Sequence, residues 1–161
     1  MKIRGFTVVE LMMTIAILAI LLSIGIPSFS SIVGNSNMSA NSSDLLTAFN
    51  YARTEAIKRG ASVALGKNDG STWSGGLVVW VDENGDGSLG NTEEVLRYWD
   101  AFSTDSSLVS GNSVTSFIFR ATGEVNNADT LTLCDSRTGE TGRTISVLLS
   151  GAIYAENYIC T

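Results

Sequence analysis

The stretch GFTVVELMMTIAILAILLSIGIPSF, from Gly5 to Phe29, decides the fold of this chain. Glu10 is its only charged residue, and apolar side chains fill most of the other positions. A helix from Phe6 to Phe29 is about 36 Å long at 1.5 Å per residue, which exceeds the ~30 Å hydrocarbon core of a bilayer. The stretch therefore predicts a membrane-spanning helix over residues 6–29.

Residues 1–5 form a short polar leader with two positive charges, on Lys2 and Arg4. Basic residues that flank a membrane helix tend to stay in the cytoplasm, so this leader predicts a cytoplasmic N-terminus. The part of the chain that follows the helix is then exported to the other side of the membrane.

Glu10 is unexpected within an apolar segment. A charged side chain costs about 2.5–3.5 kcal/mol on insertion scales at the centre of a membrane helix and somewhat less near an end, where Glu10 lies, so it normally has a partner. A conventional secretory signal cut near Ser23 or Gly25 is one alternative and a plain anchor is another, but neither uses the carboxylate. A cut after Gly5 gives Phe6 an α-amino group one helical turn from Glu10. That amine, in the same or a neighbouring subunit, can neutralise the carboxylate.

The composition excludes most enzyme classes. The chain has 161 residues, no histidine and two cysteines. This removes histidine-based catalysis, zinc sites with histidine ligands and four-thiolate clusters. Ten Lys and Arg against sixteen Asp and Glu give a net charge of −6, the opposite of the balance in proteins that bind nucleic acid non-specifically. We therefore expect a protein that is not an enzyme.

The segment SFSSIVGNSNMSANSSD, which follows Pro27, is rich in Ser and Asn. These side chains compete with a helix for backbone hydrogen bonds. We expect the helix to be kinked or partly loosened there, and a plain linker is the alternative.

The remaining chain predicts one further helical segment and then strands. The segment from Asp44 to Gly60 places an apolar face on a helix, and Glu55 precedes Arg59 by four residues, a supportive spacing. The members of the apolar face are Leu45, Phe49, Ala52 and Ala56. The expected strands are Ser62–Leu65, Leu77–Val81, Val95–Trp99, Ser116–Arg120, Thr130–Cys134 and Thr144–Leu149. No long helical pattern separates them, which predicts an antiparallel sheet.

The string GFTVVEL at residues 5–11 resembles the cleavage and methylation site of type IV prepilins, the class III signal. In that family a membrane aspartic peptidase cuts after the Gly and methylates the new terminal Phe. The resemblance implies cleavage after Gly5 and N-methylation of Phe6, and Pro27 also fits the family. YARTEAIKRG at residues 51–60 resembles the signature of the GspH/FimT family of minor pilins and pseudopilins.

This resemblance implies an α+β type IV pilin fold, in which a long N-terminal helix packs on an antiparallel β-sheet head domain. The expected division is a leader peptide at residues 1–5, a transmembrane and assembly helix at 6–29, a helical stem at 30–60 and a head domain at 61–161. Glu10 and Pro27 are the expected assembly residues, and Glu10 is expected to set the register between subunits.

An acidic loop from Asp82 to Glu93 satisfies the calcium-loop spacing D-x-[DN]-x-[DN]-G-x5-E. The oxygen ligands it offers are those of Asp82, Asn84, Asp86 and Glu93. The runs on either side are expected strands, whereas the calcium loop of this spacing joins two helices. A β-hairpin loop that uses Asn-Gly and Asp-Gly turns is therefore the alternative. Structural Ca²⁺ is the one cofactor that this chain suggests.

Cys134 and Cys160 are the two thiols of the chain. An exported head faces the oxidising periplasm, so we expect them to form a disulfide that ties the C-terminal tail to a strand. Two unpaired buried thiols are the alternative.

The resemblance implies a minor type IV pilin, an assembly subunit of the pilus tip or priming complex that supports pilus biogenesis and twitching motility. Its implied partners are other minor pilins, the major pilin, prepilin peptidase and the inner-membrane assembly platform. The implied location is the inner membrane, as a single-pass precursor with a periplasmic head, and then the pilus or pseudopilus at the cell surface. An H-type minor pseudopilin of a type II secretion system is the first alternative.

A pilus-associated DNA receptor for natural transformation is the second alternative. Family members that bind DNA carry a Gly-Arg-x-Arg segment near the C-terminus. The matching position here, Gly151 to Tyr154, has neither arginine. Isolated arginines such as Arg120, Arg137 and Arg143 are more typical of solvated surface charges. Nucleic acid is therefore not among the expected partners.

Overall fold

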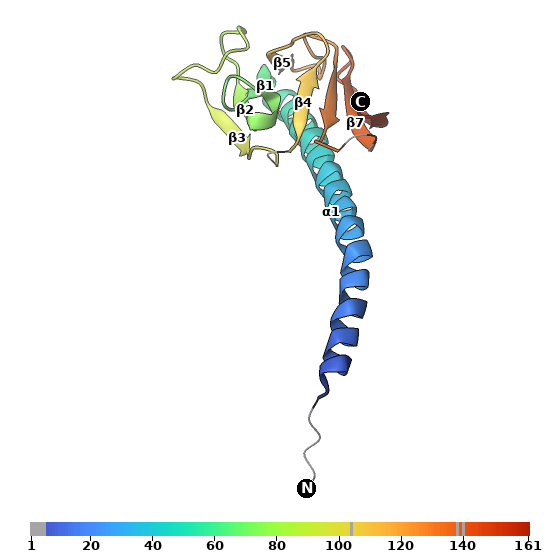
Figure 1. Ribbon diagram of the computed structural model, residues 1–161. Coiled ribbons are helices and arrows are strands. Elements are labelled where there is room, and N and C mark those ends of the chain that lie inside the picture. The colour runs from blue at the N-terminus through green and yellow to red at the C-terminus, as the bar shows by residue number, and fades with distance from the viewer. Residues whose placement is uncertain (1–5, 104, 138, 140) are drawn as a thin grey trace. The chain divides into compact units, whose positions relative to one another are not determined.

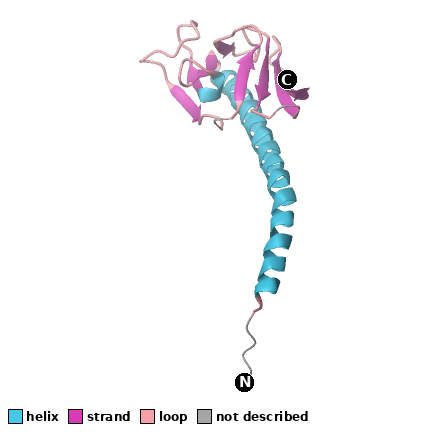
Figure 2. Ribbon diagram, viewed as in Figure 1, coloured by secondary structure: helices cyan, strands magenta, loops and turns pink. Residues whose placement is uncertain are grey.

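The computed structural model describes residues 6–103, 105–137, 139 and 141–161. These residues form one long α-helix, a short 3₁₀ helix and eight strands (Figures 1 and 2). The chain divides into two compact units, the first ending at Ser36 and the second running from Asn37 to Thr161.

Helix α1 runs from Val8 to Arg59, and the segment rich in Ser and Asn is helical throughout. The expected loosening of this segment is therefore wrong. Two of its hydroxyl groups donate to carbonyl groups about one turn earlier, from Ser28 to Ile24 at 3.1 Å and from Ser31 to Ser28 at 3.0 Å. Hydroxyls that are satisfied in this way leave the backbone hydrogen bonds of the helix in place.

In the first unit, α1 exposes apolar side chains around its whole circumference. The large apolar side chains from Phe6 to Phe29 are between 48% and 77% exposed. Within the described residues, α1 is the one helix that is long and apolar enough to cross a membrane, and the rest of the structure buries none of its apolar window. A helix that is apolar on every face is typical of surroundings made of lipid or of other helices.

The second unit contains two four-stranded sheets with the orders β3-β2-β1-β5 and β4-β6-β7-β8. The strands are β1 Val63–Lys67, β2 Leu77–Val81, β3 Val95–Trp99, β4 Ser107–Ser110, β5 Ser116–Phe119, β6 Asp129–Cys134, β7 Thr141–Val147 and β8 Ile153–Ile159, and η1 is Trp73–Gly75. Every pair of neighbouring strands is antiparallel, which confirms the predicted sheet type.

Strands β4 and β8 are absent from the six that the sequence predicted. In β4 only Leu108 is fully buried, and in β8 only Ile153 is even partly buried. Strands that bury so few side chains lack the alternation of buried apolar and exposed polar residues by which a strand is recognised. Their position in the sheet depends on the pairing with β6 and β7 instead.

The predicted apolar face of the second helical segment is confirmed, because all four of its side chains are fully buried: Leu45, Phe49, Ala52 and Ala56. Phe49 meets Phe117 of β5 edge to face, with ring centroids 5.1 Å apart. Aromatic pairs of this geometry add about 0.5–1.5 kcal/mol to the free energy gained from burial alone. This contact packs the end of α1 against the strands of the second unit.

A charged network surrounds the last turn of α1. Glu55, which is 8% exposed, accepts a hydrogen bond from Arg59 Nε at 2.9 Å, as its spacing predicted, and one from Lys58 Nζ at 3.3 Å. Arg59 Nη1 lies 2.8 Å from Oε2 of Glu94, the residue that directly precedes β3. The hydrogen bond from Arg59 lowers the pKa of Glu55 and outweighs the opposing effect of burial.

We predict that acid weakens the protein in part through Glu55. Because its folded pKa lies below the ordinary value of 4.5, the carboxylate stabilises the fold above that value, and this contribution is lost as pH falls through the folded pKa. Thermal unfolding of the full chain in detergent between pH 7 and pH 3 measures the effect. Glu55→Gln is expected to lower Tm at pH 7 and to flatten its decline below pH 4.5. An unchanged decline would contradict the assignment.

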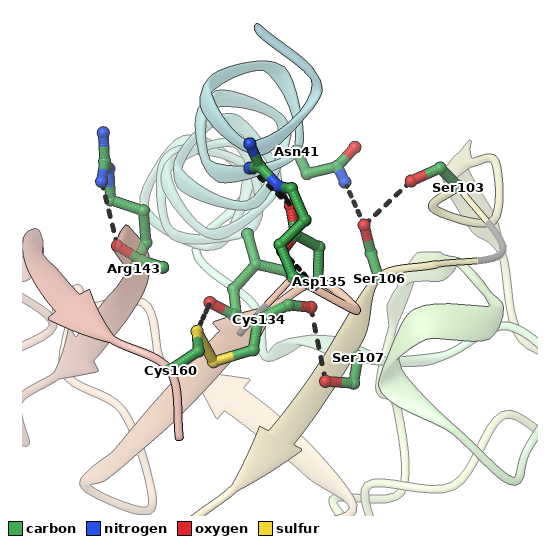
Figure 3. Close-up of polar contacts among 11 residues, drawn as sticks. Asn41, Ser103, Ser106, Ser107, Cys134, Asp135, Arg143 and Cys160 are labelled. Carbon is green, nitrogen blue, oxygen red and sulfur yellow. Dashed lines mark hydrogen bonds and ion pairs between the residues drawn. A yellow bond between two sulfur atoms is a disulfide. The ribbon is translucent and has the colours of Figure 1, made fainter. Parts of the chain in front are cut away.

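Cys134, at the end of β6, and Cys160, just after β8, form the predicted disulfide (Figure 3). The bond crosses β7, which lies between these two strands in the sheet. Gly142 of β7 leaves room for it, because a Cβ at this position would collide with Cys160 Sγ and the Leu133 carbonyl. The disulfide therefore fixes the C-terminal end of β8.

We predict that replacing both cysteines by serine lowers the free energy of unfolding by about 3–4 kcal/mol, because the bond closes a loop in the unfolded chain. Denaturant unfolding of the full chain in detergent, with and without reductant, measures the loss. Reductant is expected to destabilise the parent chain and to leave the double serine variant unchanged. Equal stability of the two proteins without reductant would contradict the prediction.

Candidate functional site

Glu10 lies in the first turn of α1 and forms a capping box with Thr7, the residue before the helix. The Glu10 amide donates to Thr7 Oγ1 at 3.2 Å, and the Thr7 amide donates to Glu10 Oε2 at 3.1 Å. The Thr7 hydroxyl also donates to Glu10 Oε2, at 3.1 Å. A reciprocal pair of this kind satisfies two of the backbone N–H groups that are left without partners at the start of a helix.

The contact between Thr7 and Glu10 was not expected from the sequence. Its signal is present, since T-x-x-E directly before an apolar run is the signature of a capping box. The structure thus gives the carboxylate a partner that does not depend on cleavage. Within the described residues Glu10 Oε1 accepts no hydrogen bond, so this oxygen is open to a second donor.

The position of Glu10 suits a negative charge. Carboxylates in the first turn of a helix interact favourably with its dipole, typically by about 0.3–1 kcal/mol. Phe6, whose nitrogen would become the α-amino group after cleavage, directly precedes the capping residue and is 77% exposed. The carboxylate is therefore oriented by its own helix at the end where a new positive charge would appear.

The other predicted processing and assembly residues are placed as follows. Gly5 and the rest of the leader lie outside the described residues, so cleavage after Gly5 and methylation of Phe6 stay predictions. Pro27 lies within α1, with helical residues on both sides. A proline inside a helix removes one backbone hydrogen bond, so the helix has a weaker point at this residue.

The acidic loop joins β2 to β3, which are antiparallel neighbours, as its hairpin alternative predicted. Asp82 is buried, and its carboxylate accepts hydrogen bonds from the amides of Gly85 at 2.9 Å and Gly87 at 3.2 Å. Gly85 and Gly87 both have positive φ angles, of 75° and 69°, which glycine adopts at low cost. These bonds fold the loop back on its first residue.

The other expected calcium ligands also bond within the loop. Asp86 accepts from the Ser88 amide at 2.7 Å and from the Asn84 side chain at 2.9 Å, and Glu93 accepts from the Gly90 amide at 2.7 Å. In the part of the chain that the structure describes, no three His, Cys, Asp or Glu side chains are grouped closely enough to hold a metal ion. This arrangement gives no support to calcium binding, which stays a prediction.

Two of the arginines considered for DNA binding, Arg137 and Arg143, contact other residues of the chain, and Figure 3 shows the contact of Arg143. Arg137 Nη2 lies 2.6 Å from Asp135 Oδ2, and Arg143 Nη1 donates to the Gly142 carbonyl at 2.9 Å. Burial raises the pKa of Asp135. The hydrogen bonds and positive charge of Arg137 together lower it by more than burial raises it, so the net shift is downward. Because Asp135 neutralises the charge of Arg137, this guanidinium adds little attraction for phosphate.

Two protein-family models match this chain. The model described as "Type II transport protein GspH" matches residues 41–151. The model described as "Prokaryotic N-terminal methylation motif" matches residues 1–26, the part that contains the leader and Glu10. No match is found among the curated proteins.

Solved structures share the fold. The type IV minor pilin FimU of Pseudomonas aeruginosa aligns with a TM-score of 0.67 and 22% identity, over 78% of this chain and 92% of FimU. A second crystal form of FimU aligns with a TM-score of 0.59 and 22% identity, over 76% and 91%. The minor pseudopilin EpsH from the type 2 secretion system of Vibrio cholerae aligns with a TM-score of 0.54 and 11% identity, over 74% and 96%.

These findings agree with the architecture described above, a long N-terminal helix packed on antiparallel sheets, which is the type IV pilin fold. The GspH model covers more than half of the chain, and the methylation motif covers its start. The chain therefore belongs to the GspH family of minor pilins and pseudopilins, and it is a structural protein rather than an enzyme.

Proposed function

We propose that this chain is a minor type IV pilin that acts in the tip or priming complex of the pilus and supports pilus biogenesis and twitching motility. The observation that carries the proposal is the start of α1, where one carboxylate is oriented by a capping box within an exposed apolar helix. Such a helix has two suitable environments, the bilayer before assembly and a bundle of similar helices afterwards.

In the proposed mechanism, prepilin peptidase cuts after Gly5 and methylates Phe6, which becomes the N-terminus. The new amine is positive, and Glu10 Oε1 is open to accept from it. When the helix leaves the bilayer for the filament, the carboxylate of one subunit pairs with the amine of a neighbour. Pairing neutralises two charges in an apolar setting, so only the register that brings them together is favourable.

The proposed partners follow from this mechanism. Prepilin peptidase and the inner-membrane assembly platform act on the precursor, whose head lies in the periplasm. Other minor pilins and the major pilin then surround the apolar helix in the filament. The disulfide of the head is compatible with this location, because disulfides persist in the oxidising periplasm.

A second candidate is a minor pseudopilin of a type II secretion system, which the fold likeness to EpsH favours. The higher TM-score to FimU leads us to place the pilus first. Deletion of the gene, scored in parallel for twitching and for protein secretion, separates the two. Loss of twitching with intact secretion supports the pilus, and the reverse result supports the secretion system.

We predict that Glu10→Ala lowers the amount of this subunit in sheared filaments at least tenfold, because the neighbouring amine then lacks its counter-charge. Glu10→Gln is expected to lower this amount similarly, because glutamine keeps the shape of the side chain and loses its charge. Quantitative immunoblots of filament and membrane fractions measure the ratio. The precursor should still insert and be cleaved, so that its amount in the membrane is maintained.

Two further variants separate charge pairing from helix capping. Thr7→Ala removes the capping box and keeps the charge, so it is expected to reduce incorporation only mildly. Glu83→Ala removes an exposed carboxylate of the acidic loop and is expected to have no effect. Normal incorporation of Glu10→Ala would contradict the proposed pairing.

A further inference from the structure

Strand β8 is one edge of the second sheet and pairs only with β7 among the described strands (the dark red strand in Figure 1). The pairing is antiparallel, includes all residues from Ile153 to Ile159 and has no register shift. The N–H and C=O groups on the open side of an edge strand have no ladder partner. Such an edge can therefore accept a further strand from another chain.

The other sheet edges are shorter or already covered. At β5, the Ile118 amide donates to the Asn126 side chain at 2.8 Å, and the Asn126 amide donates to the Ile118 carbonyl at 3.0 Å. Strand β4 has only four residues. Strand β3 has five, and its pairing with β2 is irregular where the register shifts between Val79 and Trp80 of β2. In the described part of the chain, β8 is thus the longest regular open edge.

The side chains of β8 are exposed on both faces of the sheet. Tyr154 is 44% exposed, Tyr158 40% and Ile159 67%. Glu156, the middle residue of the strand, makes no side-chain hydrogen bond or ion pair within the described residues. Proteins commonly protect open edges with charged side chains, proline or a bulge; β8 has no proline or bulge, and Glu156 is its one charged residue.

Both ends of β8 are held in place. Before the strand, a turn at Gly151 is closed by hydrogen bonds from the Gly151 amide to the Leu148 carbonyl at 2.7 Å and from the Leu148 amide to the Ala152 carbonyl at 2.9 Å. After the strand, Cys160 is tied to Cys134. An edge fixed in its final conformation loses little entropy when another strand joins it.

The charge on Glu156 argues against a second copy of this chain as the joining strand. Antiparallel pairing of β8 with another β8 over its full length would place Glu156 opposite Glu156, and like charges directly opposite are destabilising. The net charge of −6 adds repulsion between copies. A strand with Lys or Arg opposite Glu156 avoids both penalties and gains an opposite-charge pair.

We propose that the open edge of β8 receives an extended segment of a different protein subunit, with a basic residue opposite Glu156. The side chains two positions before and after that residue lie beside Tyr154 and Tyr158, so apolar residues fit there. This contact is made by the head and lies beyond the helix pairing proposed above. Its test needs no filament, so its failure would leave the role of Glu10 untouched.

The test uses the full chain in detergent micelles and two capped seven-residue peptides of alternating Thr and Val, one with Lys and the other with Glu at its centre. Fluorescence anisotropy measures binding, and amide hydrogen exchange locates it. The Lys peptide is expected to bind about fivefold more tightly than the Glu peptide and to slow exchange in residues 153–159. Glu156→Lys should reverse the preference.

Glu83→Lys is the matched control, because it changes the net charge equally at an exposed position in the loop after β2. The Glu83→Lys variant should still prefer the Lys peptide. This result would show that binding depends on the charge at position 156 and not on the net charge of the protein. Equal binding of the two peptides, slowed exchange outside residues 153–159, or no binding of either peptide would overturn the proposal.

Discussion

The cost of one carboxylate within an apolar helix is the constraint on which this structure depends. An uncompensated carboxylate in lipid is costly, and the fold provides part of the compensation for Glu10 through Thr7 and the start of α1. In the proposed mechanism, the remaining oxygen accepts from the positive α-amino group that cleavage after Gly5 would create. The proposed mechanism thus links membrane insertion, processing and assembly through one side chain.

The two units of the chain differ in how their apolar side chains are buried. Up to Ser36 the helix leaves its apolar side chains exposed and needs other molecules to cover them. From Asn37 onward the same helix buries Leu45 and Phe49 in a core of its own. The second unit therefore has a hydrophobic core of its own, whereas the apolar side chains of the first are suited to burial in a membrane or a bundle of helices.

The sequence predicted the features that depend on strong local patterns. These include the apolar helix, the buried face around Phe49, the antiparallel sheets and the disulfide, each marked by hydrophobic spacing or residue type. Strands β4 and β8 could not be predicted, because their exposed side chains carry no such pattern. The family resemblance implied a helical stem after Pro27, whereas the composition suggested loosening; the composition misled because Ser28 and Ser31 bond to carbonyl groups of their own helix. At Glu10 the charge was recognised, but its partner Thr7 was overlooked despite the T-x-x-E spacing.

The most direct test of the central claim is the chemical identity of the N-terminus in the subunit isolated from filaments. Mass spectrometry of the N-terminal peptide determines both the first residue and its methylation. The account predicts that the peptide begins at Phe6 and carries one N-methyl group, four positions before Glu10. A peptide that begins at any other residue would contradict it, because the carboxylate would then lack its positive partner.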